Sequence, residues 1–171
     1  ELMDIYLINR CRLFVGTNSG PNEVANLFAK PTVFVNLTEW SVGHPMKRGD
    51  LAIIKHVFSH SRNRFLSIRE ILEEPIGWQD FGPGLDGYSM VENTPEEIRD
   101  VIAEYLSRPE DHENSELQEA FNNERRRQIH RWFDQDGTTS QGLIGTYRIA
   151  ARCDSAAGTL GQKYLEQNWH T

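Results

Sequence analysis

The chain has few cysteines, few positive charges and no long apolar run, and each shortage argues against a class of protein. Cys11 and Cys153 are the only cysteines, so there is no disulfide framework, no CxxC motif and no zinc signature. We therefore expect a reducing compartment. No apolar run approaches the roughly 18 residues of a membrane span, so we expect a cytoplasmic protein with no membrane span. Lys+Arg 18 against Asp+Glu 25 gives a net charge of -7, which argues against a nucleic-acid partner.

The length allows one compact domain. A chain of 171 residues buries enough surface to hold a core without metal or disulfide. It begins with Glu1 rather than Met, inside an amphipathic pattern at residues 3–10 that is typical of the end of a helix. We interpret the chain as a fragment of a longer protein.

The first third of the chain predicts an α/β fold. Residues 12–16 and 32–36 are short apolar runs typical of buried strands, and residues 21–30 between them have the pattern of a helix. Pro21 suits the first helical position, and the residue before Pro31 disfavours a continued helix. Strands this close around one helix are expected to be parallel, joined by a right-handed crossover. With another strand at residues 51–54, we predict a Rossmann-like parallel sheet flanked by helices.

The rest of the chain is punctuated by helix starts. Ser67 with Glu70 and Thr94 with Glu97 have capping-box spacing, which predicts that helices follow. After residue 107 the amino-acid composition becomes mostly polar. We divide the chain into a domain at residues 1–106 and a helical extension at residues 107–171, packed on that domain. The remaining expectations are a loop at 77–89, a short strand at Tyr88–Val91, a polar helix at 115–134 and no assigned boundary beyond residue 146.

The turn from Gly16 to Pro21 carries the first functional hypothesis. It joins the carboxyl end of a buried strand to the amino end of a helix, where ligands bind in open α/β sheets. Free N–H groups and the helix dipole suit a phosphate, and Thr17, Asn18 and Ser19 add polar partners. Gly16 and Gly20 allow a ligand to approach the backbone closely. The alternative is a tight turn without a ligand, since neither P-loop nor GxGxxG spacing is present.

A resemblance to a known family adds to this hypothesis. The run VGTNSGPNEVANLFAKPTVFVN at residues 15–36 looks like the carboxyl-terminal domain of GT-B glycosyltransferases. It is similar to the heptosyltransferase pattern of an apolar strand, G-x-[DN]-SG-P, a helix, G/A-K-P and a strand. Segments at 49–55, 64–72 and 92–98 then follow an order that resembles a group of bacterial glycosyltransferase-like proteins. The resemblance covers roughly residues 2–106.

The resemblance implies a specific role for the turn. In GT-B enzymes a nucleotide-sugar lies between two Rossmann-like domains, and the second domain holds the nucleotide. Gly16–Pro21 would contact the donor diphosphate, with no bound metal or cofactor, and Asn18 stands where an Asp is common. The resemblance also implies an acceptor site on an N-terminal domain of the same full-length protein, transfer to an acceptor in surface-polysaccharide assembly, and no activity of this fragment alone.

Four further residues are candidates for the same nucleotide-sugar site. Lys55 follows an apolar strand and offers a charge to a phosphate, or is simply exposed. In GT-B relatives acids near this helix bind a ribose hydroxyl, and the resemblance implies that role for Glu23. The alternative is that Glu23 only complements the helix dipole. Asn36 and Glu39 follow the second strand, where ordinary turn chemistry is the alternative. No catalytic residue is assigned.

Two alternative functions remain open. A nucleotide-sugar 2-epimerase shares the fold and a Ser-Gly turn, although its pattern usually carries SGG followed by paired acids. A degenerate domain that acts as a non-catalytic scaffold is the other alternative. His56 and His60 have helical metal spacing, but their segment does not have a helical pattern.

Overall fold

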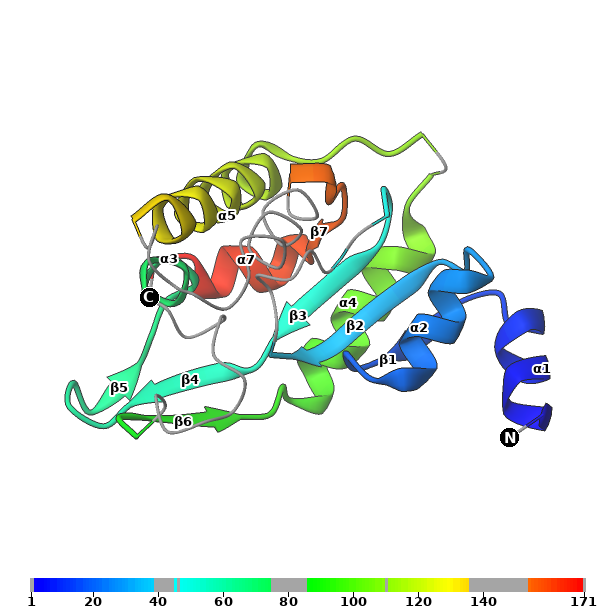
Figure 1. Cartoon of the computed structure of the whole chain (residues 1–171), viewed down its shortest axis with the longest axis horizontal. Helices are drawn as coiled ribbons and strands as arrows, with labels where there is room; N and C mark the ends of the chain where they lie inside the picture. Colours follow the sequence, from blue (N-terminus) through cyan, green and yellow to red (C-terminus); the bar gives the residue numbers. More distant parts are fainter. Residues whose placement is uncertain are drawn as a thin grey trace.

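The computed structural model has a parallel sheet at its centre (Figure 1). The strands are β1 (Phe14–Gly16), β2 (Thr32–Leu37), β3 (Leu51–Ile54) and β7 (Thr159–Leu160), in the order β1-β2-β3-β7. All three pairings are parallel, which confirms the predicted α/β fold. The structure describes residues 2–38, 45, 47–74, 86–109, 111–135 and 154–170, without the side chains of 132–135.

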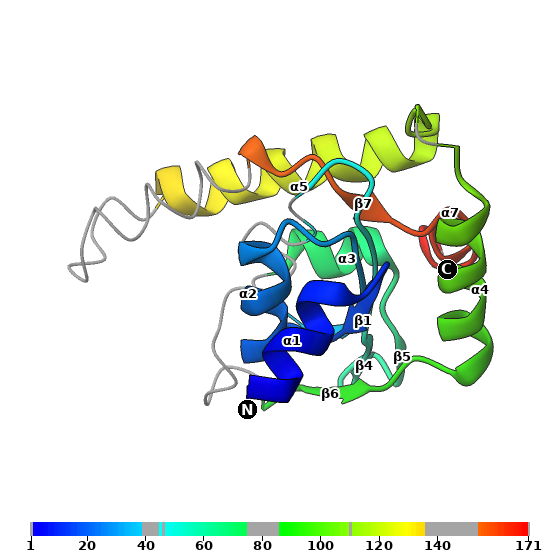
Figure 2. The same cartoon turned by 90° about the vertical axis from the view of Figure 1, so that its right-hand side faces the viewer.

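Helices cover both faces of the sheet (Figure 2). Helix α2 (Gly20–Leu27) lies on one side, and α4 (Pro95–Ser107) lies on the other. Further helices among the described residues are α1 (Leu2–Arg10), α3 (Ile68–Glu73), α5 (Glu116–Gln135) and α7 (Gln162–Asn168). None of the described helices combines the length and the apolar composition needed to cross a bilayer.

Helix α2 differs slightly from its predicted bounds. It begins at Gly20, with Ser19 as N-cap and Pro21 as its second residue, and it ends at Leu27 instead of Lys30. The amide of Ala29 donates to the Asn26 carbonyl and the amide of Lys30 to the Ala25 carbonyl, both at 2.9 Å. These two bonds form a Schellman motif, which ends the helix before Pro31.

The Schellman motif gives a stability prediction. Ala29 has a φ of 52°, in the left-handed region that favours glycine. Ala29→Gly should raise the free energy of unfolding by about 0.5–1 kcal/mol, because relief of this strain outweighs the added freedom of the unfolded chain. Urea unfolding measures the change. A loss of stability in Ala29→Gly would contradict the strained geometry at this helix end.

A second, antiparallel sheet was not predicted in full. It consists of β4 (His56–Ser59), β5 (Arg64–Phe65) and β6 (Tyr88–Val91), in the order β5-β4-β6. The predicted strand at Tyr88–Val91 is confirmed as β6. The sequence pattern does not reveal β4 as a separate strand, because only Lys55 separates it from β3. Most of the predicted loop at 77–89 lies outside the described residues.

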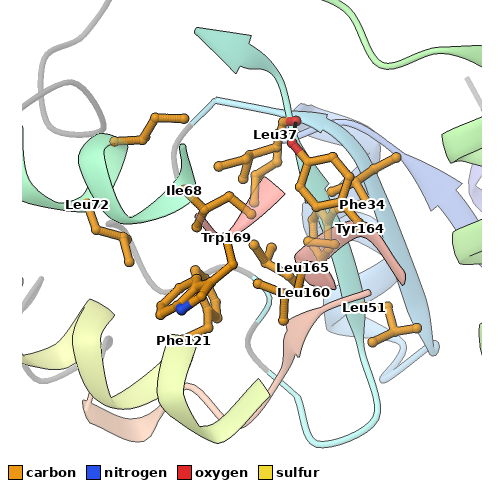
Figure 3. Close-up of a cluster of buried hydrophobic side chains, with 14 of the residues drawn as sticks. Phe34, Leu37, Leu51, Ile68, Leu72, Phe121, Leu160, Tyr164, Leu165 and Trp169 are labelled. Atoms are coloured by element: carbon orange, nitrogen blue, oxygen red, sulfur yellow. Dashed lines mark hydrogen bonds between the residues drawn. The ribbon is translucent and has the colours of Figure 1, made fainter. Parts of the chain in front are cut away.

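The carboxyl-terminal segment contributes to the main core. Strand β7 pairs with β3, through Leu51 with Thr159 and Ala52 with Leu160. Leu160 and Leu165 are fully buried, and Figure 3 shows them with Phe121 of α5 and Trp169 in one cluster. The division at residue 107 stays a prediction, but the extension adds a strand to the sheet of the first domain.

Asp50 ties together the amino ends of β2 and β3. Its carboxylate accepts from the Thr32 amide at 2.9 Å and the Lys47 amide at 3.3 Å, with Lys47 Nζ at 3.6 Å. Burial raises the pKa of Asp50 to about 6, and the Lys47 charge and the two amides only partly oppose that rise. Asp50 is therefore a buried acid at the amino ends of the strands, and the predicted ligand turn lies at their opposite, carboxyl ends.

Candidate functional site

The predicted turn lies at the surface, at the carboxyl end of β1. Thr17 and Ser19 are exposed, Asn18 is half-buried, and Gly20 and Pro21 at the start of α2 are exposed. The two glycines have different roles. A Cβ at Gly16 would lie 2.8 Å from Cε1 of Phe14, whereas a Cβ at Gly20 would meet open space. A side chain at position 16 would therefore force the Phe14 ring to shift, while nothing in the described fold requires Gly20.

The start of α2 differs from the other described helix starts that have a cap. Capping boxes close α3 at Ser67 and α4 at Thr94, and Ser115 with Gln118 does the same for α5. The first amide of α7 donates to the carboxylate of Glu104 at 2.8 Å. At α2, Ser19 makes no side-chain cap hydrogen bond. The positive end of the α2 dipole is therefore not satisfied by a capping side chain.

Not every backbone position at the start of α2 has an N–H group available to a ligand. The Asn22 amide donates to the Ser19 carbonyl at 2.9 Å, and Pro21 has no N–H. The Ser19 hydroxyl reaches only the Thr17 carbonyl, at 3.5 Å, which is a weak bond. Among the described residues no hydrogen bond is formed by the amides of Ser19 and Gly20 or by the Thr17 hydroxyl, so these groups and the Ser19 hydroxyl can meet an anion.

The residue after β2 reaches this turn. The Thr38 hydroxyl donates to Oδ1 of Asn18 at 3.4 Å. Polar residues that follow two adjacent strands, β1 and β2, are thus in contact at the carboxyl ends of these strands. Sequence reasoning assigned no ligand role to Thr38. Its only signal was its place immediately after an apolar strand. Glu39, the next predicted site residue, lies outside the described residues.

Asn36 has a structural role at the same edge. Its φ is 52°, and the β2–β3 register shifts between Phe34 and Leu37. The Asn36 amide donates to Oδ1 of Asn93 and the Asn93 amide donates to Oδ1 of Asn36, both at 2.7 Å. Nδ2 of Asn93 also donates to the Ile54 carbonyl at 2.8 Å. The side-chain oxygen of Asn36 is thus engaged within the protein. No pattern in the sequence indicated Asn93 as its partner.

Lys55 follows β3 and stands between the two sheets. Its amide donates to the Leu37 carbonyl at 2.9 Å, which fixes the backbone beside the end of β2. Its ammonium lies 3.7 Å from a carboxylate oxygen of Glu92, whose side chain is 75% exposed. An ion pair this exposed contributes little, so the Lys55 side chain can exchange Glu92 for a phosphate at small cost. Glu23 is exposed in the first turn of α2.

His56 and His60 have separate partners. Nε2 of His56 lies 2.9 Å from a carboxylate oxygen of Glu97, while Nε2 of His60 lies 2.8 Å from the Ser89 hydroxyl. Burial alone would raise the pKa of Glu97, but the Thr94 amide and His56 outweigh it and lower that pKa. Within the described ranges, no group of three His, Cys, Asp or Glu side chains could hold a metal ion.

A small depression lies elsewhere, between α4 and α7. Its lining includes Asp100, Glu104 and Lys163, and its cavity volume is about 10 Å³, the space of roughly one water molecule. A nucleotide does not fit there. The turn before α2 is therefore the better candidate, as an exposed edge and not as a closed pocket.

Comparison of the chain with known protein families, with curated proteins and with solved structures found no match.

Proposed function

We propose that this chain is the donor-binding half of a glycosyltransferase that moves a sugar from a nucleotide-sugar to an acceptor, in surface-polysaccharide assembly. The donor diphosphate would bind at Gly16–Pro21. The observation that carries the proposal is the uncapped, exposed start of α2 at the carboxyl end of a parallel strand. The resemblance of residues 15–36 to the GT-B pattern supplies the substrate class.

The proposed chemistry needs few groups from this chain. Negative charge develops on the diphosphate as the glycosidic bond breaks, and fixed donors stabilise that charge. Here the stabilising donors would be the amides of Ser19 and Gly20, the hydroxyls of Thr17 and Ser19, and the Lys55 ammonium. The acceptor site and the catalytic base would lie in the N-terminal domain of the full-length protein, so we expect this chain alone to bind nucleotide weakly and turn over nothing.

Gly20→Ala tests the site without disturbing the fold. The added methyl enters open space in the free protein but occupies the approach of a diphosphate to the backbone. We expect nucleotide-sugar affinity to fall by about tenfold, which corresponds to roughly 1.4 kcal/mol. The free energy of unfolding should stay the same or rise slightly, since alanine favours helix. Calorimetry with a panel of nucleoside diphosphate sugars measures the affinity.

Gly87→Ala is the matched control. A Cβ at Gly87 also meets open space, and this residue lies in the turn before β6. Equal losses of affinity in Gly20→Ala and Gly87→Ala would contradict the assigned site. If no nucleotide binds the full-length protein and Ser19→Trp changes no activity, the scaffold alternative replaces the proposal.

A further inference from the structure

Helix α1 presents an apolar surface at one end of the molecule. Its exposed apolar side chains include Leu2 at 85%, Met3 at 64%, Tyr6 at 58% and Leu7 at 56%, and none of its residues is buried. Figures 1 and 2 show α1 beside α2 at the β1 end of the sheet. A helix with apolar residues around most of its circumference is normally covered on more than one side.

The adjacent edge of β1 is also open. The Phe14 amide donates to the Pro31 carbonyl at 2.9 Å, toward β2. Because a parallel ladder alternates, the amide and carbonyl of Val15 point away from β2, to the outer edge. The Val15 side chain is 40% exposed, and β1 pairs with no described strand other than β2. The unpaired groups of such an edge are a template for pairing with a further strand.

The handedness of the fold identifies what fits this edge. The chain passes from β1 through α2 to β2, one strand along the sheet, and right-handed crossovers place successive helices of such a series on one face. Helix α1 leads directly into β1 and contacts α2 on its outer side. That is the place of a crossover helix arriving from a strand outside β1.

We propose that a β-strand of the same polypeptide, preceding α1, pairs in parallel with the outer edge of β1 and covers the apolar side of α1. The outer edge of β1 is continuous with the β1–β2 ladder, and the exposed side of α1 is continuous with the α1–α2 contact. The proposed strand would therefore extend the existing sheet. This inference does not rest on the proposed function. It states that the preceding segment completes this domain's own sheet, before any separate N-terminal domain.

Photo-crosslinking in the polypeptide translated from the complete gene tests the inference. Leu7→p-benzoylphenylalanine places the probe on α1, and Leu106→p-benzoylphenylalanine is the control, because Leu106 is 60% exposed at the far end of α4. We expect an intramolecular crosslink from position 7 to a segment before Glu1, mapped by mass spectrometry, at least tenfold above the yield from position 106.

Each other outcome overturns the inference. A crosslink from position 7 to a second copy would assign the face to a dimer instead. Equal yields from positions 7 and 106 would show that the face is uncovered. A gene product with fewer than about ten residues before Glu1 would leave no room for a strand and its connection to α1.

Discussion

Asn93→Ala should lower the free energy of unfolding by about 3 kcal/mol. The substitution removes the acceptor for the Asn36 amide and one donor to the Ile54 carbonyl, both at the end of the main sheet. The Ile54 carbonyl keeps a second bond, from the Tyr164 hydroxyl at 2.6 Å, but the Asn36 amide loses its partner. An orphaned amide in a half-buried place costs about 1–3 kcal/mol beyond the lost bond. Urea unfolding measures the difference.

Asn36→Gly provides the matched comparison. This change leaves the Asn93 amide without its acceptor, but glycine adopts the φ of 52° without strain, which offsets part of that cost. We expect a loss of about 1 kcal/mol. An equal or smaller loss of stability in Asn93→Ala than in Asn36→Gly would contradict the role of the Asn93 side chain in holding the ends of β2 and β3 together.

The stability of the protein should depend on pH through Asp50. Burial raises the pKa of its carboxyl from 3.8 to about 6, so the folded state holds the proton more tightly than the unfolded state does. The resulting stabilisation is fully present below pH 3.8 and is lost as the pH rises through about 6. A shift of about two units corresponds to roughly 3 kcal/mol. Stability should therefore fall across this window on the account of Asp50.

Asp50→Asn isolates this contribution, because the amide does not titrate. The Asn side chain still offers one acceptor for the Thr32 amide. Measured between pH 4 and pH 7.5, the wild-type free energy of unfolding should fall by about 3 kcal/mol more than that of Asp50→Asn. Parallel pH profiles of the two proteins would show that the burial of Asp50 does not raise its pKa.

Local signals in the sequence predicted the parts of the fold whose causes are local. The β1–α2–β2 unit follows from two apolar runs around a helix bounded by prolines, and the structure confirms it. Both predicted capping boxes are present, because each depends on residues three positions apart.

The remaining features depend on distant partners. Strand β7 has two residues and exists only through its pairing with β3. Arg125 sits in a basic run that is typical of a solvated helix face, yet it is fully buried. Its guanidinium lies over the Phe121 ring and donates to the Gly158 carbonyl at 3.4 Å, 33 residues away. At the candidate site the turn was predictable, while Thr38 and Asn93 required the sheet.

An amide NMR titration with nucleoside diphosphate sugars shows whether a diphosphate binds at the start of α2. We expect chemical-shift changes concentrated at Thr17–Gly20, where the start of α2 is uncapped, and at Lys55. The starts of α3 and α4 should stay unchanged, because capping boxes already occupy their amides. Shifts centred between α4 and α7, or no shift at Thr17–Gly20 at saturating nucleotide-sugar, would contradict diphosphate binding at the start of α2.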